Sequence, residues 1–141
     1  MNRESFQDEE VAEILNKYFI PIKVDREERP DLDKVYIYFA EALTGYAGWP
    51  LTVFLTPDKI PFYAGTYFPK RSQNNRIGLI ELLNKIKDLW KERKEEIIKD
   101  SNNILEEVDK SFNRIRKGNI DEDIFYRTYK ELENSFDETY G

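Results

Sequence analysis

The chain has 141 residues, of which 40% are hydrophobic and 14% aromatic, so it is long enough and apolar enough to fold around one core. Its net charge of −6 argues against nucleic acid or an anionic membrane surface as a partner, because both need a basic surface. Neither cysteine nor histidine is present, which excludes thiolate chemistry, disulfides and thiol metal sites within the chain and removes the commonest general base.

The apolar residues are spread along the chain and form no run of membrane-spanning length. The first residues are polar and acidic and do not resemble a signal peptide, so we expect a cytoplasmic protein. We also expect no cofactor and no metal.

The first elements in chain order are a helix, a strand and a second helix. Residues Ser5 to Asp8 fit a capping box, with Ser5 as the cap of an amphipathic helix over 6–17. Residues 19–25 predict a short strand, which Pro21 pushes toward a sheet edge because proline lacks a backbone N–H. A charged loop follows, and Pro30 suits the first turn of the second helix.

The middle of the chain predicts a hairpin. Gly45 and Gly48 follow the second helix, and either suits a left-handed C-cap. An apolar strand over 51–55, expected to be buried, leads into a turn at 56–59. Residues 60–68 are its predicted partner strand.

Three further helices are predicted after residue 78. The first carries an apolar stripe from Leu79 to Trp90, the second begins near Ser101 and ends near Gly118, and the third begins at Asp121. Ile120 and Phe125 are spaced as a hydrophobic staple for the third helix. This order of elements predicts an α/β layer fold that carries a hairpin.

Several blocks of the sequence, taken in order, resemble one protein family. They are RESFQDEEVA (3–12), VDREERPD (24–31), ALTG (42–45), GWPLTVFLTPD (48–58) and FYAGTYFP (62–69). Together they resemble the thioredoxin-like N-terminal domain of the family that includes spermatogenesis-associated protein 20, long filed as a domain of unknown function.

The resemblance implies a thioredoxin-like fold that lacks its first strand and its Cys-x-x-Cys motif and carries extra C-terminal helices. It covers residues 1–115 as an incomplete thioredoxin-like domain. Residues 116–141 resemble a helical lead-in to a missing C-terminal α/α barrel. The intact family domain looks like a thiol–disulfide oxidoreductase, so we expect this chain, truncated at both ends, to be inactive in that reaction.

A missing first strand would leave the strands at 19–25 and 51–55 without a shared neighbour and with unpaired backbone groups. We therefore expect one of three outcomes. The two strands close up, a partner chain such as another copy fills the gap, or the chain is poorly stable.

The candidate groove consists of Gly48, Trp49 and Pro50 with Asp25 and Arg29. The resemblance implies a cis Trp49–Pro50 bond and a surface that pairs with an extended protein or peptide, which makes a non-catalytic interaction module the alternative function. The plainer alternative for Asp25 and Arg29 is a solvated helix-entry loop in which Arg29 pairs with an acid. A third hypothesis is hydrolysis by carboxylates at Asp25 and Glu28, which needs a dry cleft.

Overall fold

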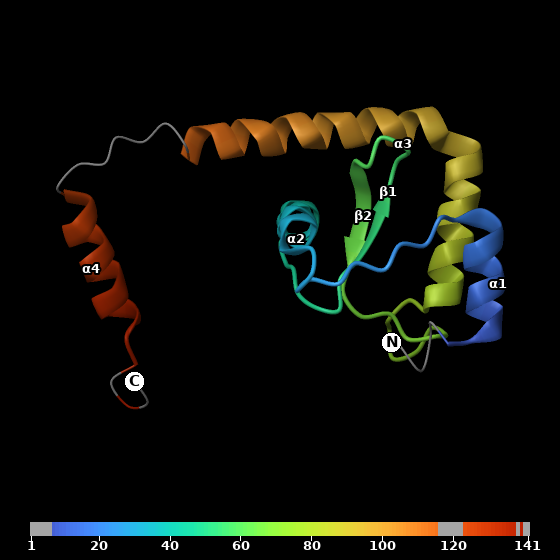
Figure 1. Cartoon of the computed structure of the whole chain (residues 1–141), viewed down its shortest axis with the longest axis horizontal. Helices are drawn as coiled ribbons and strands as arrows, with labels where there is room; N and C mark the ends of the chain where they lie inside the picture. The colour runs from blue at the N-terminus through green and yellow to red at the C-terminus, as the bar shows by residue number, and fades with distance from the viewer. Residues whose placement is uncertain (1–6, 116–122, 138, 140–141) are drawn as a thin grey trace. The chain divides into compact units, whose positions relative to one another are not determined.

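The structure is a computed structural model, and it describes residues 7–115, 123–137 and 139. The elements in chain order are α1 (Glu9–Tyr18), α2 (Pro30–Thr44), β1 (Thr52–Leu55), β2 (Pro61–Gly65), α3 (Leu79–Ile115) and α4 (Asp123–Ser135). Contacts divide the chain into two compact units, Met1–Val108 and Asp109–Gly141. Figure 1 shows the hairpin of β1 and β2 between α2 on one side and α1 with the start of α3 on the other.

The start of α1 differs from the prediction. Asp8 is the N-cap, and its carboxylate accepts hydrogen bonds from the backbone N–H groups of Glu10 and Val11. Asp is among the best N-caps because its oxygen satisfies amides that have no partner within the helix. Ser5, the predicted cap, lies outside the described residues.

The predicted strand at 19–25 does not form. This stretch is irregular, and the described sheet contains only β1 and β2. The first of the three expected outcomes, in which this stretch and β1 close up into a ladder, is therefore wrong. A strand needs a ladder partner on at least one edge, and no described strand is hydrogen-bonded to this stretch.

The second helix and the hairpin agree with the sequence. Pro30 occupies the first turn of α2, and Gly45 ends the helix with a φ of 73°, a left-handed conformation that glycine adopts at little cost. β1 and β2 pair antiparallel, with Val53 opposite Ala64 and an irregularity between Phe54 and Leu55. Every residue of β1 is half-buried, so the expectation of a buried strand is wrong.

The core of the first unit lies between α1, α3 and the hairpin. Its buried members come mainly from one stripe of α3, joined by one residue of α1 and one that follows β2: Val11, Phe68, Leu79, Ile80, Leu82, Leu83 and Ile86. Phe54 of β1 and Phe62 of β2 pack against this cluster. The ring of Phe62 stacks on the ring of Trp90, with 5.7 Å between the two centroids. On the other side of the hairpin, α2 packs on β2.

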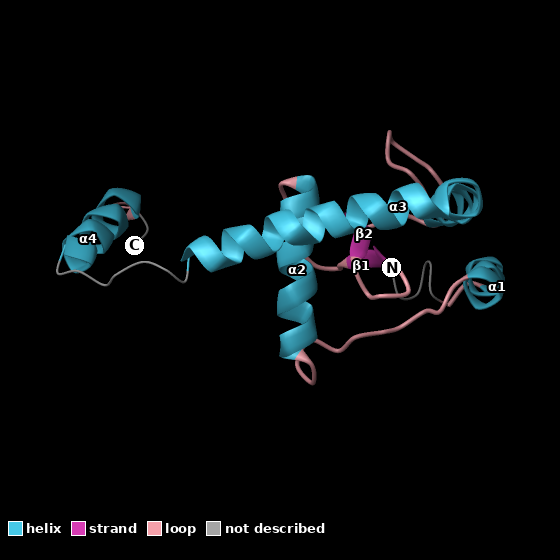
Figure 2. Cartoon of the chain, turned by 90° about the horizontal axis from the view of Figure 1, so that it is seen from above, coloured by secondary structure: helices cyan, strands magenta, loops and turns pink. Residues whose placement is uncertain are grey.

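The helices that follow the hairpin are divided differently from the prediction. α3 consists of two helices that meet at a kink at Arg93, so the break lies there and Ser101, where a new helix was expected, lies inside the second of them. Figure 2 shows that α3 runs as one long helix beyond this point. Ser101 is compatible with the helix because it is fully buried and its hydroxyl donates to the carbonyl of Ile97 at 2.6 Å.

α4 begins at Asp123, close to the predicted start. The predicted staple cannot be assessed, since Ile120 lies outside the described residues. Several large apolar side chains of α4 and the residue after it are exposed, namely Ile124, Phe125, Tyr126, Tyr129, Leu132 and Phe136. No described helix has both the length and the apolar character needed to cross a membrane.

Candidate functional site

The candidate site begins with a tight turn that precedes α2. The Asp25 carboxylate accepts from the N–H of Glu27 at 2.8 Å, and the Asp25 carbonyl accepts from the N–H of Arg29 at 2.8 Å. An aspartate that bonds the backbone two residues later closes an Asx turn. The turn fixes the path of the chain at Arg26, the residue that reaches across to Trp49.

Trp49 is the centre of the site. The guanidinium carbon of Arg26 lies 4.4 Å from the centroid of the Trp49 ring, within the range of a cation–π contact. The indole Nε1 donates to the Asp33 carboxylate at 2.9 Å. Trp49 is nevertheless 55% exposed. A large aromatic surface is thus held in place from two sides and still presented to solvent.

The backbone beside Trp49 has a defined shape. The Trp49–Pro50 peptide bond is cis, and Pro50 is exposed. Gly48 is half-buried, and a Cβ at this position would lie 3.1 Å from the hydroxyl oxygen of Tyr46, tighter than an ordinary contact. The Thr44 hydroxyl donates to the Tyr46 carbonyl and so ties this loop to the end of α2.

Arg29 makes an ion pair with Asp31, and the cation that covers the Trp49 ring is Arg26. Its guanidinium donates two hydrogen bonds to that carboxylate, at 2.9 and 2.7 Å. The Arg29 hydrogen bonds lower the pKa of Asp31 to about 2, and the same contact raises the pKa of Arg29. Both side chains are more than half exposed, so the pair adds little stability. The plainer alternative for Arg29, pairing with an acid at the helix entry, is the arrangement observed.

The site as observed differs in membership from the predicted one. Gly48, Trp49 and Pro50 are adjacent in the chain, and Asp25 shapes the neighbouring turn. The residues that contact the Trp49 ring are Arg26 and Asp33, which the sequence did not single out. The sequence signal that could have identified Arg26 was its position as a basic residue directly after the stretch at 19–25. No such signal marked Asp33 as a site residue, because an acid in the first turn of a helix is explained by the helix dipole alone.

The Trp49 site combines an exposed aromatic ring with the guanidinium of Arg26 and the carboxylate of Asp33. The chain has no cysteine and no histidine, and the described residues contain no group of three or more acidic side chains placed to hold a metal. Asp25 and Glu28 are both exposed, so the dry cleft that carboxylate hydrolysis requires is not found around them.

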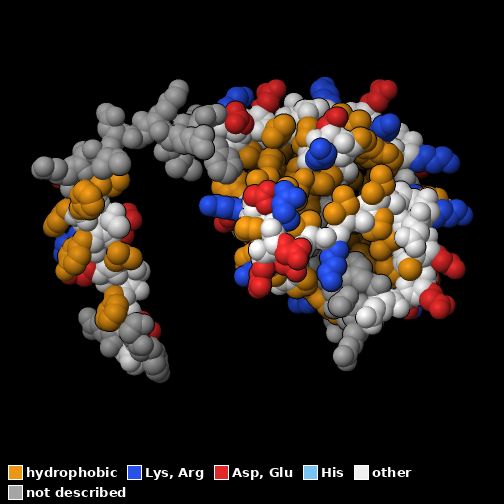
Figure 3. Space-filling model, viewed as in Figure 1, with side chains coloured by type: hydrophobic (Ala, Val, Ile, Leu, Met, Phe, Trp, Pro, Cys, Tyr) orange, Lys and Arg blue, Asp and Glu red, His pale blue; other side chains and the backbone are white. Residues whose placement is uncertain are grey.

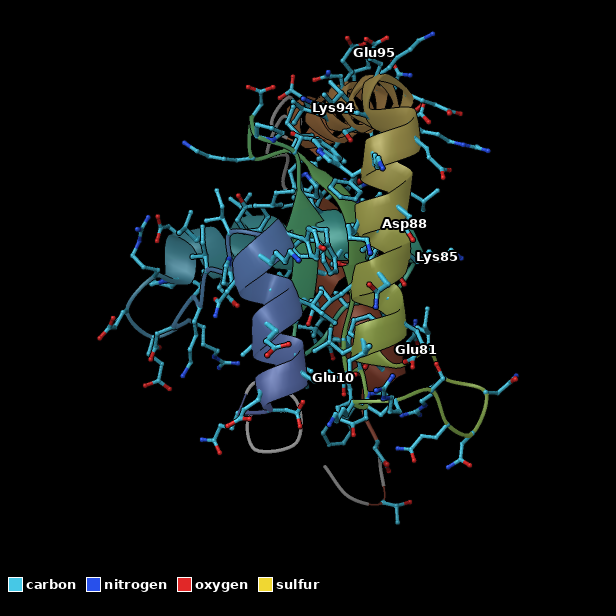
Figure 4. The ribbon with its side chains drawn as sticks, turned by 90° about the vertical axis from the view of Figure 1, so that its right-hand side faces the viewer. Glu10, Glu81, Lys85, Asp88, Lys94 and Glu95 are labelled. Atoms are coloured by element: carbon cyan, nitrogen blue, oxygen red, sulfur yellow. The ribbon has the colours of Figure 1, made fainter. Side chains whose placement is uncertain are left out.

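A second cluster of charges, outside this site, joins three segments of the core. Lys70 pairs with Asp8 at 2.7 Å, and Arg71 pairs with both Glu10 and Glu81. Figure 4 shows Glu10 on α1 and Glu81 at the start of α3, near the same end of the two helices. The hydrogen bond from Lys70 lowers the pKa of Asp8. This cluster fixes the loop before α3 to α1 and is structural.

Helices packed on a hairpin, with a cis Trp-Pro bond shortly before β1, agree with the thioredoxin-like class, and the sequence comparison establishes that class. A family model of this class, Thioredox_DsbH, described as "Protein of unknown function, DUF255", matches residues 1–109. The chain belongs to this family.

Three relatives match the chain over its whole length. It is 40% identical over 143 residues to "Uncharacterized protein B0495.5" of Caenorhabditis elegans and 37% identical over 145 residues to spermatogenesis-associated protein 20 of Homo sapiens. The protein of that name from Rattus norvegicus is 38% identical over 145 residues. All of this chain takes part in each match, but it spans only 18–19% of the length of these relatives.

Proposed function

We propose that this chain is a thioredoxin-like domain that does not itself catalyse thiol–disulfide exchange. The observation that carries this proposal is the absence of cysteine from all 141 residues. Exchange proceeds by attack of a thiolate on a disulfide sulfur, and no other side chain replaces that nucleophile. Any thiol chemistry of a longer protein that contains this chain would need cysteines from outside it.

An insulin-reduction assay tests this directly. Purified chain is mixed with insulin and dithiothreitol, and turbidity from the released B chain is followed beside a buffer blank and an authentic thioredoxin. We expect the rate to equal that of the blank. A rate that rises in proportion to the chain concentration would overturn the proposal.

The second candidate function is a non-catalytic interaction module, and the exposure of Trp49 favours it. Aromatic side chains supply a large contact area at low entropic cost and are enriched at binding hot spots. Here the ring lies between Arg26 and Asp33, which offer a donor group and an acceptor group at its two sides. An extended peptide would place an apolar side chain on the ring and polar groups against these neighbours.

Tryptophan fluorescence separates this surface from the rest of the fold, because the chain has two tryptophans and the other, Trp90, stacks on Phe62. A fixed array of unstructured, cysteine-free peptides is the probe. We expect the Trp90→Phe variant to bind a subset of the array with a change in Trp49 emission. The Trp49→Ala variant should bind none of that subset. Equal binding by Trp49→Ala, or no binding by the native chain to any peptide, would contradict the interaction module.

A further inference from the structure

The stretch 20–24 is an exposed apolar segment that runs between two fixed points. Before it, the ring of Phe19 meets the ring of Phe54 on β1 edge-on, with 5.9 Å between the centroids. After it, Arg26 covers Trp49, which precedes β1. Between these contacts Ile20 is 89% exposed, Ile22 76% and Val24 41%.

These three side chains alternate with Pro21 and Lys23, which is the spacing of a strand. In an extended chain the apolar set lies on one face. Backbone groups alternate between the two edges in the same way, so Pro21 removes a donor only from the edge that it shares with Lys23. The other edge, formed by Ile20, Ile22 and Val24, keeps all its backbone donors. The segment therefore has the composition of a strand and one complete edge for pairing.

β1 provides an unpaired edge of the matching kind. The described sheet has two strands, so β1 is bonded to β2 along one edge only. All four residues of β1 are half-buried, and none is charged. An uncovered strand edge is a template for adding another chain, and proteins usually block it with charges, proline or a covering element. Figure 3 shows an apolar band across the first unit, next to a group of acidic and basic side chains.

We propose that the partner for this surface is a second copy of the chain, with segment 20–24 of each copy adding as a strand to β1 of the other. Each copy carries both the free strand and the free edge, so a single twofold axis satisfies both at once. The pairing surfaces contain no acidic residue, although the chain as a whole has a net charge of −6. Pairing through these surfaces therefore places no carboxylate of one copy directly against a carboxylate of the other within the added strands.

The interface is small, so the dimer is weak. Two reciprocal strands of this length fall at the low end of specific interfaces, and we expect a dissociation constant of about 1–100 µM. The proposal does not depend on peptide binding at Trp49. That binding can fail while the dimer forms, since the dimer uses the backbone of β1 and the side chains of 20–24.

Sedimentation velocity on the 141-residue chain, at about 1 to 500 µM, tests the proposal. We expect a reversible monomer–dimer equilibrium. Ile22→Asp should raise the dissociation constant by about 100-fold or more, because two copies of the aspartate would enter each dimer. Ile22 is exposed in the monomer, so the circular dichroism spectrum should not change. Ile20→Asp provides a second variant with the same expected effect.

The matched control is Leu132→Asp on α4, a similarly exposed apolar residue outside the proposed interface, which should leave the dissociation constant within about twofold. Hydrogen exchange at β1 amides should slow as the chain concentration rises. A monomer at every concentration would overturn the proposal. So would a dimer that resists Ile22→Asp and Ile20→Asp, or one that only Leu132→Asp disrupts. Protection of β1 in a monomer by an added strand peptide alone would assign the edge to a different partner.

Discussion

Replacing Trp49 by phenylalanine removes the indole N–H and keeps an aromatic ring beneath Arg26. The lost contact is the 2.9 Å hydrogen bond to the Asp33 carboxylate. Trp49 is 55% exposed, so water partly replaces the bond, and we expect a loss of about 1 kcal/mol in the free energy of unfolding. Trp49→Ala also removes the cation–π contact with Arg26, which adds about 0.5–1 kcal/mol at an exposed site.

A double-mutant cycle isolates the hydrogen bond from the other effects of each substitution. The four proteins are the native chain, Trp49→Phe, Asp33→Ala and the double variant, each unfolded in urea and followed by far-ultraviolet circular dichroism. Asp33→Ala also removes an acid from the first turn of α2, but that effect is present in both arms of the cycle and cancels. We expect a coupling energy of about 1 kcal/mol with an unchanged dependence on urea.

The control cycle pairs Asp33→Ala with Trp90→Phe. Trp90 is half-buried, stacks on Phe62 of β2 and should show no coupling with Asp33. A coupling below about 0.3 kcal/mol for the Trp49 cycle would refute the geometry given for the site, because residues in direct contact couple more strongly than that. An equal coupling in the control cycle would refute it too.

Three further predictions concern the fold. Leu83 is completely buried in the core, so Leu83→Ala should lower the free energy of unfolding in urea by about 2–5 kcal/mol. The exposed Lys85 on the same helix is the control, and Lys85→Ala should change that free energy by no more than about 0.5 kcal/mol. Equal effects of the two substitutions would contradict the core assignment. Gly45→Ala should lower the free energy of unfolding by about 1–2 kcal/mol because a φ of 73° is strained for alanine, although its Cβ would meet no atom within 4 Å. Gly45→Asn should cost less, because asparagine tolerates this conformation better. An unchanged melting temperature for Gly45→Ala would show that the helix ends differently. The pKa of Asp31 is about 2 in the folded state, below the value of about 3.9 in the unfolded chain, and the pKa of Asp8 is lowered as well. The stability that these two carboxylates contribute is therefore complete at a pH above the unfolded pKa. It is lost as the pH falls from about 4 toward 2. Melting temperatures should therefore fall across that range, and because the Arg29–Asp31 pair is exposed, the Asp31 pKa itself is read from an NMR titration; a value of about 3.9 would contradict the Arg29 ion pair.

The parts of the fold that the sequence predicted correctly are those determined by local chemistry. Proline in the first turn predicted the start of α2, and the two glycines narrowed its end to Gly45 or Gly48, of which the structure uses Gly45. The hairpin followed from the turn at 56–59 between two apolar stretches. These signals need no knowledge of distant residues, because a backbone that lacks a donor or requires a positive φ restricts the structure on its own.

The wrong predictions depended on partners elsewhere in the molecule. Residues 19–25 have the pattern of a strand, but a strand also requires a neighbour, and no pattern within the segment reveals whether one is present. The N-cap of α1 is Asp8 and not the predicted Ser5, because both residue types suit an N-cap and the sequence pattern alone did not distinguish them. Ser101 suggested a helix start, yet its hydroxyl bonds within the helix.

The sequence identified only part of the candidate site, because its other members also depend on residues that are distant in the chain. Trp49 and Pro50 are conspicuous in sequence because both are rare residue types with strong structural effects. Arg26 and Asp33 reach Trp49 only through the fold, so charge pattern alone could not choose them over Asp25 and Arg29. Arg29 was selected on its position in the loop, and the structure shows it engaged with its nearest acid.

The kink at Arg93 separates α3 into two helices of unequal local stability. Before it, Leu79, Leu82, Leu83 and Ile86 are buried, whereas from residue 94 to residue 110 only Ser101 and Val108 are buried. Local opening costs least where few apolar groups must be exposed. The later part can therefore fray or yield to a protease while the earlier part stays folded. Arg93 marks a natural boundary for limited proteolysis and for the spread of amide exchange rates along α3.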